Sequence, residues 1–442
     1  MESLGYVFRA LMGIIGILGL AYLLSSDRRN VNWRVVAGGL VLQIIIAAGV
    51  LLFPAVEALF SLIAQMFAIA LEISVNAAGF VFGPLADLAK MEGAFGRDNG
   101  FVFAFMALPS ILFFSALSSL LYYFGVLQFV VRKMAWVMSR VLRLSGAESL
   151  AAAANVFVGQ TEAPLIVKPY VPQMTRSEML ALMVGGMATI AGSVFAIYMG
   201  MLGGSNEQAK IEFGKFLLCA SVMNAPAALL VAKILLPETQ DVSRDLSVSR
   251  ESIGRNPIDA LANGTSQGLK LALNVGAMLI AFYAVIMLVN EILGGVGNMP
   301  WFGAGNLNGW ISEMSGGQFD GLSLETIFGV MFAPIAWLIG VNGNETLRVG
   351  QLIGIKIFAT EFFAYVKLAG MKEAGLSARS VFLSTFALCG FANFMSIGIQ
   401  IGGIGALAPD RRSDLATLGV KALIGGTLAS LLSACIAGMF FS

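Results

Sequence analysis

The chain has 442 residues, of which 58% are hydrophobic and 12% charged, and its mean hydropathy is +0.84. This apolar share exceeds that of soluble domains, so the composition predicts an all-α polytopic membrane protein. The net charge of +1 argues against nucleic acid as a partner, and the absence of histidine removes the commonest general base and zinc ligand.

Eight apolar stretches are long enough to cross the ~30 Å hydrocarbon core of a membrane as helices. They cover residues 10–25, 35–53, 101–124, 179–201, 216–236, 271–289, 381–407 and 422–441. An even number of crossings places both termini on one side of the membrane. The first stretch is followed by Asp27-Arg28-Arg29 and by no obvious cleavage motif, so we expect a retained span rather than a signal peptide.

Other segments are predicted to lie at the membrane surface or in water. Residues 55–74 and 127–144 carry polar side chains on one helical face, which is typical of amphipathic interfacial helices, although 55–74 also fits a core-packing helix. Residues 237–267 and 294–321 are rich in charged, Ser, Gly or Asn residues, and we expect loops there.

The distribution of lysine and arginine predicts the orientation. Basic residues gather in 26–34, 125–177, 237–267 and 408–416, which the eight-span count places on one side. Short loops rich in these residues face the cytoplasm, so both termini are predicted outside the cytoplasm. The basic residues of 340–380 do not fit this rule as a plain loop.

Two parts of the chain repeat one pattern. Each has Ala-Trp in an apolar helix, Thr-Glu about 25 residues later, and a span interrupted by small and polar residues some 30 residues beyond. The matching positions are Ala135-Trp136, Thr161-Glu162 and 187–193 in one copy, and Ala336-Trp337, Thr360-Glu361 and 390–396 in the other. Three crossings separate the copies, so they are inverted across the membrane, as in many transporters. Chance resemblance is the alternative.

The Thr-Glu elements are too polar to cross the membrane as plain helices. An arm of about ten residues, at 1.5 Å per residue, reaches about half the thickness of the hydrocarbon core. We therefore predict two re-entrant hairpins, residues 146–175 from the cytoplasm and residues 344–373 from outside. Their tips are expected to meet near the middle of the membrane.

Polar side chains converge at the predicted meeting point. The hairpin tips supply Gln160, Thr161, Glu162 and Glu361, and the interrupted spans add Thr189, Ser193, Asn393 and Ser396. This set is rich in hydrogen-bond donors and acceptors and poor in positive charge, which suits a neutral polyhydroxyl or heterocyclic solute better than a phosphate. Unwound backbone carbonyls with a hydroxyl and an amide also suit sodium.

Four motifs resemble the concentrative nucleoside transporter family. They are Gly-Gln-Thr-Glu-Ala-Pro at 159–164, Ala-Gly-Ser at 191–193, Thr-Glu-Phe at 360–362 and Gly-Phe-Ala-Asn-Phe at 390–394. The first is the most distinctive, the others follow in the right order, and the similarity extends over about 125–442. The span count matches the eight-span bacterial members.

The resemblance implies roles for particular residues. It places a nucleobase against Gln160, Thr161, Glu162 and Val194, and a ribose against Glu361, Phe391, Asn393 and Ser396. It places sodium between the side chains of Asn155 and Thr189 and the carbonyls of Val158 and Ile190. Structural roles are the alternatives: Asn155 as a bridge between hairpin arms, the two glutamates as backbone acceptors, and Val194 and Phe391 as core packing.

The resemblance also implies a domain organisation and a mechanism. Members form homotrimers in which a transport domain with both hairpins moves past a scaffold in an elevator-like cycle. We expect residues 1–124 to be mostly scaffold, 125–236 and 321–442 to form the transport domain, and 237–320 to hold a linker, the sixth span and an outer loop.

The predicted function is sodium-coupled import of uridine-like nucleosides across a bacterial inner membrane, without an organic cofactor. A proton-coupled symporter and a passive facilitator are alternatives on the same fold. An intramembrane enzyme with Glu162 and Glu361 as an acid/base pair is a third possibility, which the lack of histidine, of a cysteine nucleophile and of a metal cluster in the sequence disfavours.

Overall fold

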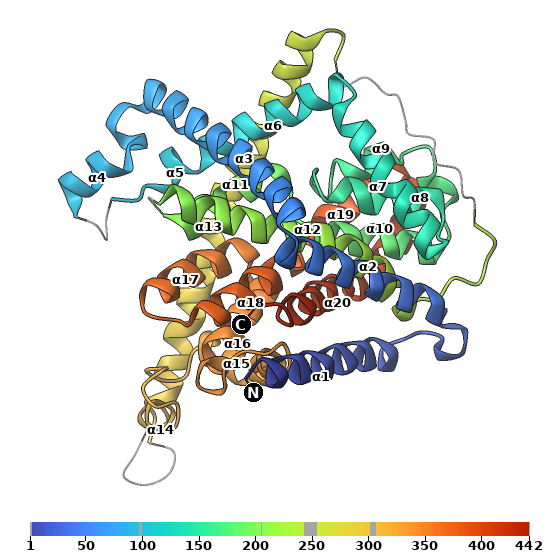
Figure 1. Cartoon of the computed structure of the whole chain (residues 1–442). Helices are drawn as coiled ribbons and strands as arrows, with labels where there is room; N and C mark the ends of the chain where they lie inside the picture. The colour runs from blue at the N-terminus through green and yellow to red at the C-terminus, as the bar shows by residue number, and fades with distance from the viewer. Residues whose placement is uncertain (1, 97–99, 205, 243–253, 301–305, 442) are drawn as a thin grey trace.

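The computed structural model of the protein describes residues 2–96, 100–204, 206–242, 254–300 and 306–441. Every regular element within these residues is a helix, which confirms the predicted all-α fold (Figure 1). Eight of the described helical stretches are long and apolar enough to cross a membrane: Gly5–Leu23, Trp33–Leu52, Pro54–Phe95, Phe103–Tyr123, Arg176–Gly203, Glu207–Leu235, Pro257–Gly297 and Pro409–Ala437.

These eight stretches are not the same eight that the sequence predicted. The predicted interfacial segment 55–74 belongs to α3 (Pro54–Phe82), whose length and hydropathy also qualify it as a candidate span. Its interfacial position therefore stays a prediction. The single span predicted at 381–407 consists of two shorter helices, α18 (Ala378–Leu388) and α19 (Phe394–Leu407). They are separated where the small and polar residues predicted an interruption.

Two segments predicted as loops contain helices. Helix α13 (Pro257–Gly297) begins inside the predicted loop 237–267, because the Asn256 side chain caps it and a proline occupies its first position. The predicted loop 294–321 contains α14 (Leu307–Met314). The parts of these loops at 243–253 and 301–305 lie outside the described residues.

The N-terminal helices pack against helices of the later part of the chain. They are α1 (Glu2–Leu23), α2 (Trp33–Leu52), α3, α4 (Leu88–Phe95), α5 (Phe103–Met106) and α6 (Leu108–Tyr123). Helix α6 packs closely on α13 because Gly264 and Gly268 carry no side chain at the contact. A Cβ atom at Gly264 would lie 2.5 Å from Ser119 Oγ.

From α7 onward the chain twice follows the order helix, hairpin, broken helix, helix. The first copy comprises α7 (Val126–Leu142), α8 (Gly146–Asn155), α9 (Ala163–Ile166), α10 (Arg176–Ala188), α11 (Gly192–Gly203) and α12 (Glu207–Leu235). The second comprises α15 (Leu324–Leu338), α16 (Thr346–Phe358), α17 (Glu361–Glu373), α18, α19 and α20 (Arg412–Ala437). The described residues also hold short 3₁₀ turns at Arg28–Asn30, Gly83–Ala86, Val171–Gln173, Gly343–Glu345 and Pro409–Arg411.

The two hairpins differ in their second arms. In the hairpin of the second copy, α16 and α17 are both regular and are joined by Ala359 and Thr360, with the Thr360 side chain capping α17. In the hairpin of the first copy, α8 is followed by an irregular turn, the four-residue α9 and a 3₁₀ turn. Pro169 and Pro172 lack the backbone N–H that a continuous second arm needs.

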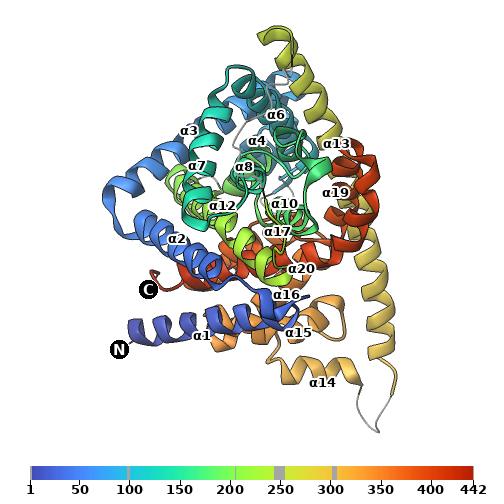
Figure 2. The same ribbon diagram turned by 90° about the vertical axis from the view of Figure 1, so that its right-hand side faces the viewer.

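The broken and unbroken helices of the two copies form the buried core (Figure 1). Within the most apolar windows of Arg176–Gly203 and Glu207–Leu235, 94% of the residues are buried, whereas the corresponding share for α13 is 6%. Figure 2 shows α13 running along one edge of the molecule. The repeats thus lie at the centre, and α13 presents most of its surface outward.

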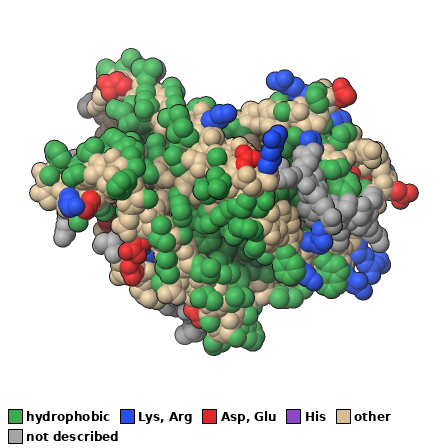
Figure 3. Space-filling view, turned by 90° about the horizontal axis from the view of Figure 1, so that it is seen from above, with side chains coloured by type: hydrophobic (Ala, Val, Ile, Leu, Met, Phe, Trp, Pro, Cys, Tyr) green, Lys and Arg blue, Asp and Glu red, His purple; other side chains and the backbone are tan. Residues whose placement is uncertain are grey.

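The outer surface is strongly apolar. In the face shown in Figure 3, hydrophobic side chains cover broad areas and charged side chains gather mostly toward the margins. Ile15, Phe80 and Ile280 are 70%, 93% and 76% exposed. Hydrocarbon solvates such a surface far better than water does. The long apolar helices and this surface identify a multi-pass membrane protein.

The beginning and end of the described chain lie together. The guanidinium of Arg379 on α18 stacks over the Tyr6 ring of α1 at 3.7 Å and donates to the carbonyls of Gly438 and Phe441. Arg9 donates to the Val341 carbonyl from the same end of α1. The two ends of the described chain therefore lie close together (Figure 1).

Candidate functional site

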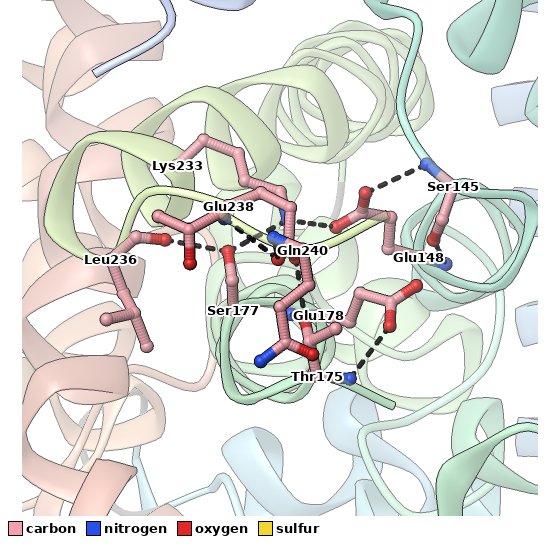
Figure 4. Close-up of polar contacts among 10 residues, drawn as sticks. Ser145, Glu148, Thr175, Ser177, Glu178, Lys233, Leu236, Glu238 and Gln240 are labelled. Carbon is pink, nitrogen blue, oxygen red and sulfur yellow. Dashed lines mark hydrogen bonds and ion pairs between the residues drawn. The ribbon is translucent and has the colours of Figure 1, made fainter. Parts of the chain in front are cut away.

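The base of the first hairpin is fixed by a buried ion pair. Lys233 Nζ on α12 lies 2.8 Å from Glu148 Oε2 on α8, and the two side chains are 3% and 1% exposed (Figure 4). Glu148 also completes a capping box with Ser145 at the start of α8. Because Asn155 lies seven residues after Glu148 on α8, this pair sets the depth of Asn155 about 10 Å further along the helix.

The same lysine joins α10 and the linker to this base. Lys233 Nζ donates to Ser177 Oγ at 2.9 Å and lies 3.5 Å from Glu238 Oε2 (Figure 4). Thr175 Oγ1, which caps α10, donates to Glu238 Oε2 at 2.6 Å. The hairpin, the broken helix and the first residues of the linker after α12 therefore share one polar cluster.

The interruptions of the two broken helices meet inside the core. Asn224 on α12 donates through Nδ2 to the carbonyls of Ala188 and Cys389, at 2.7 and 3.2 Å, so that one amide serves the C-terminal ends of both α10 and α18. Gly390 follows with φ of 119°. A Cβ atom there would lie 2.4 Å from the Ala188 carbonyl oxygen, so only glycine permits this approach.

A continuous chain of hydrogen bonds joins the tips of the two hairpins. Gln160 Nε2 donates to Ser396 Oγ at 3.0 Å, and the Ser396 backbone N–H donates to Asn393 Oδ1 at 2.8 Å. Asn393 Nδ2 in turn donates to Glu361 Oε2 at 2.9 Å. Tyr198 donates its hydroxyl to Glu361 Oε1 at 2.9 Å. Four of these five side chains were predicted as site residues from the sequence, and the fold brings them together.

Two members of this cluster were not predicted as site residues. Gln400 Nε2 donates to Gln160 Oε1 at 3.1 Å and to the Met183 carbonyl at 3.0 Å. Tyr198 was not singled out. Each lies four residues after a predicted site residue on the same helix, Ser396 and Val194 respectively, and this spacing is the signal that could have found them.

The predicted sodium ligands surround the first interruption. Asn155 is 1% exposed, and its Oδ1 and Nδ2 both lack a hydrogen-bond partner. A Cβ atom at Gly185 would lie 3.2 Å from Asn155 Nδ2, and Thr189 Oγ1 donates to the Gly185 carbonyl at 2.9 Å. A buried amide oxygen without a partner is costly, and a sodium ion bound to Asn155 Oδ1 would remove this part of the cost. The residues present therefore fit a sodium ion.

The two predicted carbonyl ligands belong to adjacent segments. Val158 lies in the turn after α8, and Ile190 lies in the interruption between α10 and α11. The Gly192 backbone N–H donates to the Phe157 carbonyl at 3.0 Å and holds these segments together.

The remaining predicted residues are less closely tied to the cluster. Thr161 is exposed, and its methyl group would lie 3.4 Å from a Cβ atom at Gly403 of α19. Glu162 is half-buried, with Oε2 buried and unpaired. Val194 is buried and Phe391 is half-buried. None of these contacts distinguishes a ligand-binding role from packing.

This combination defines the class of protein. Two hairpins and two interrupted helices bring polar side chains together inside an apolar helical protein, which is the architecture of a secondary transporter. The cluster offers hydrogen bonds and a carboxylate for binding a solute.

Comparisons with known proteins specify the family. Sequence profiles described as the N-terminus and the C-terminus of a Na⁺ dependent nucleoside transporter match residues 12–85 and 216–438, and a profile described as nucleoside recognition matches 104–205. The nucleoside permease NupC of Helicobacter pylori is 37% identical over 98% of both chains. An uncharacterized transporter of Haemophilus influenzae is 44% identical over 98% of both chains.

The chain is also similar to an animal cotransporter and to solved structures. Sodium/nucleoside cotransporter 1 of Rattus norvegicus is 36% identical, over 97% of this chain and 63% of the rat protein. The structure of CNTnw in an inward-facing substrate-bound state is 40% identical, with a TM-score of 0.88 over 99% of both chains. An outward-facing structure of a CNTnw variant has a TM-score of 0.87 over 98% of this chain and 97% of that one.

The chain therefore belongs to the concentrative nucleoside transporter family, as its motifs predicted. The family transports nucleosides, uses sodium as its coupling ion, needs no organic cofactor and is not enzymatic. The intramembrane-enzyme alternative is thereby excluded.

Proposed function

We propose that the protein imports uridine-like nucleosides together with sodium and binds both where the two hairpins meet. The observation that carries this proposal is the hydrogen-bond chain from Gln160 to Glu361, which lies next to the unpaired amide of Asn155. One polar region thus holds groups for a heterocycle, for a sugar and for an ion.

The nucleoside is proposed to lie along this chain. Gln160, Thr161 and Glu162 face the base, directly or through water, and Val194 packs against it. Glu361, Asn393 and Ser396 take the ribose hydroxyls, while Phe391 covers the sugar. A carboxylate that already accepts two hydrogen bonds, as Glu361 does, is a rigid acceptor for hydroxyl groups.

Sodium is proposed to bind Asn155, Thr189 and the carbonyls of Val158 and Ile190. Moving one charge through 100 mV provides about 2.3 kcal/mol, and about 1.4 kcal/mol is a tenfold change, so one cation supports roughly 50-fold accumulation from the voltage alone. The ion and the base share the tip of the first hairpin, so that either can order the site for the other.

The transport step is proposed to be an elevator-like movement within a homotrimer. The two repeats form a compact core, which suits a unit that moves as one body, whereas few residues of α13 are buried. We propose that residues 1–124 and 237–320 contribute the scaffold, that 125–236 and 321–442 contribute the transport domain, and that the outward face of α13 contacts the neighbouring subunits. Membership in this family and the basic loops support a bacterial inner membrane with both termini outside the cytoplasm.

Uptake into proteoliposomes tests the proposal and its alternatives. An inward sodium gradient is expected to drive accumulation of labelled uridine above equilibrium, and a potential that is negative inside should increase it. Accumulation driven by a proton gradient without sodium would favour the proton symporter. Equilibration that ignores both gradients would favour the passive facilitator, and either result contradicts the proposed sodium symport.

A further inference from the structure

A lysine is buried inside the second hairpin without a carboxylate partner. Lys356 lies in the last turn of α16 and is 1% exposed. Its Nζ donates to the Ala387 carbonyl at 2.9 Å and to Ser430 Oγ at 2.8 Å. It takes part in none of the ion pairs found among the described residues. Burying a cation without a carboxylate in contact costs free energy. The presence of a lysine at this position, with only neutral oxygen atoms as acceptors, therefore requires an explanation.

The position of Lys356 corresponds to that of Asn155 in the first repeat. Each residue lies in the last turn of the first hairpin arm, on α16 and α8 respectively. Each residue also lies against the broken helix of its own repeat, near the point where the first half of that helix ends. For Asn155 this is Gly185 of α10, and for Lys356 it is Ala387 of α18.

The unbroken helix that ends each repeat adds a second correspondence. Ser221 of α12 donates to the Val156 carbonyl, which follows Asn155, at 3.3 Å. Ser430 of α20 accepts from Lys356 itself. In both repeats a serine of the fourth element thus reaches the end of the first hairpin arm.

The surroundings of Asn155 and of Lys356 both favour a cation. The C-terminal end of a helix carries unsatisfied carbonyls and a partial negative charge, and the two broken helices each place such an end inside the membrane. In the first repeat the neighbouring side chain is a neutral amide, so the positive charge has to come from solution. In the second repeat the lysine supplies it covalently.

We propose that the Lys356 ammonium is a fixed cation, which takes in the second repeat the place that sodium takes in the first. The cation of the second repeat then stays with the protein, and only the cation of the first repeat is exchanged. This inference rests on the proposed sodium site at Asn155 and Thr189.

Equilibrium binding of labelled uridine to the purified full-length protein, titrated with sodium, tests this assignment. Lys356→Met keeps the length of the side chain and removes its charge. Lys356→Asn also leaves room for an ion beside an amide, as at Asn155. Lys367→Met is the control, because Lys367 belongs to the same hairpin but pairs with Glu325 at a partly exposed position.

The unmodified protein and the control are expected to show a sodium dependence with a Hill coefficient of about 1. Lys356→Met should bind uridine about tenfold more weakly or worse, even at saturating sodium. Lys356→Asn should recover binding at high sodium with a Hill coefficient that approaches about 2, because a second ion then has to bind.

Two results would overturn the fixed cation. One is a Lys356→Met protein that binds uridine like the unmodified protein, and the other is a Lys356→Asn protein whose sodium dependence stays at a Hill coefficient of about 1. The sodium dependence of Lys356→Asn tests the fixed cation even if the Lys356→Met protein does not fold. A lack of sodium dependence in the unmodified protein would instead contradict the proposed function.

Discussion

At the scale of single residues, the site consists of amides and one carboxylate, and hydrogen bonds between these side chains hold them in place. Gln160 is held between Ser396 and Gln400, and Glu361 between Tyr198 and Asn393. Small changes to any of these side chains should therefore alter ligand affinity more than they alter the fold, because the helices around them are packed by apolar contacts.

Glu361→Gln should weaken uridine binding by roughly 10- to 100-fold. The substitution keeps the size of the side chain but replaces one acceptor oxygen by a donor that faces Tyr198 or Asn393, and hydrogen bonds to charged groups contribute about 1.5–3 kcal/mol. Equilibrium binding measures the effect. Glu291→Gln, at an exposed position on α13, is the control and should bind as the unmodified protein does. Near-normal affinity of Glu361→Gln would show that the carboxylate is not a ligand.

Gly186→Ala should lower uridine affinity by about tenfold without unfolding the protein. A Cβ atom at this position would lie 2.7 Å from Gln400 Nε2 and 3.0 Å from Gln160 Cβ, so that both amides have to move. The control is Gly402→Ala on α19, where an added Cβ atom meets nothing within 4 Å. Thermal unfolding should be similar for the two variants. Equal uridine affinities would argue against Gln160 as a base contact.

At the scale of the elements, each hairpin depends on how its base is fixed. The first hairpin is joined to α10, α12 and the linker by the buried Glu148–Lys233 pair. Removal of one partner of such a pair leaves an unpaired charge in the interior, whereas replacing both partners can be nearly neutral.

Lys233→Met should therefore destabilise the protein by about 3–5 kcal/mol. The double variant Lys233→Met/Glu148→Gln should recover much of this loss, because the charge of the fully buried Glu148 is then no longer left unpaired. The thermal midpoint of the protein in detergent reports both effects. Lys90→Met, which removes a largely exposed ion pair with Asp87, is the control and should leave the thermal midpoint almost unchanged. If the single variant Lys233→Met were as stable as this control, the Glu148–Lys233 pair would not stabilise the fold.

Some helices and site residues can be predicted from the sequence, and others cannot. The stretch from Asn155 to Pro164 is recognisable because its polarity contrasts with an apolar chain. Tyr198, Asn224 and Gln400 are single polar residues within long apolar helices, and only their position between segments distant in sequence separates them from packing. Helix α3 has few polar residues for its length, so its hydropathy also qualifies it as a candidate span, although its polar face predicts an interfacial helix.

At the scale of the whole molecule, the arrangement separates a buried core from an exposed long helix. The two repeats are held together by Asn224 and the Gly390 approach, while α13 packs mainly on α6 and is otherwise open. Such a division fits a transport domain that moves against a fixed surface. It also makes the outward face of α13 the proposed contact between subunits.

Polar substitutions on that face should dissociate the proposed trimer. Ile280→Asn/Leu288→Asn changes two exposed side chains of α13, and Ile69→Asn/Ile73→Asn changes two exposed side chains of α3 as a matched control. The mass of the protein–detergent particle, measured by light scattering, should fall to that of one subunit for the α13 variant only. A trimer that survives the α13 substitutions would place the subunit contact elsewhere.

Sodium-dependent binding of uridine to the Asn155→Ala protein tests the central claim most directly. Asn155 offers a buried, unpaired amide oxygen beside Thr189 and the first hairpin tip, and we assign this oxygen to the coupling ion. The unmodified protein is expected to bind uridine more tightly as sodium increases. In Asn155→Ala the affinity should be low and independent of sodium. An alanine variant whose sodium dependence matches that of the unmodified protein would contradict the account.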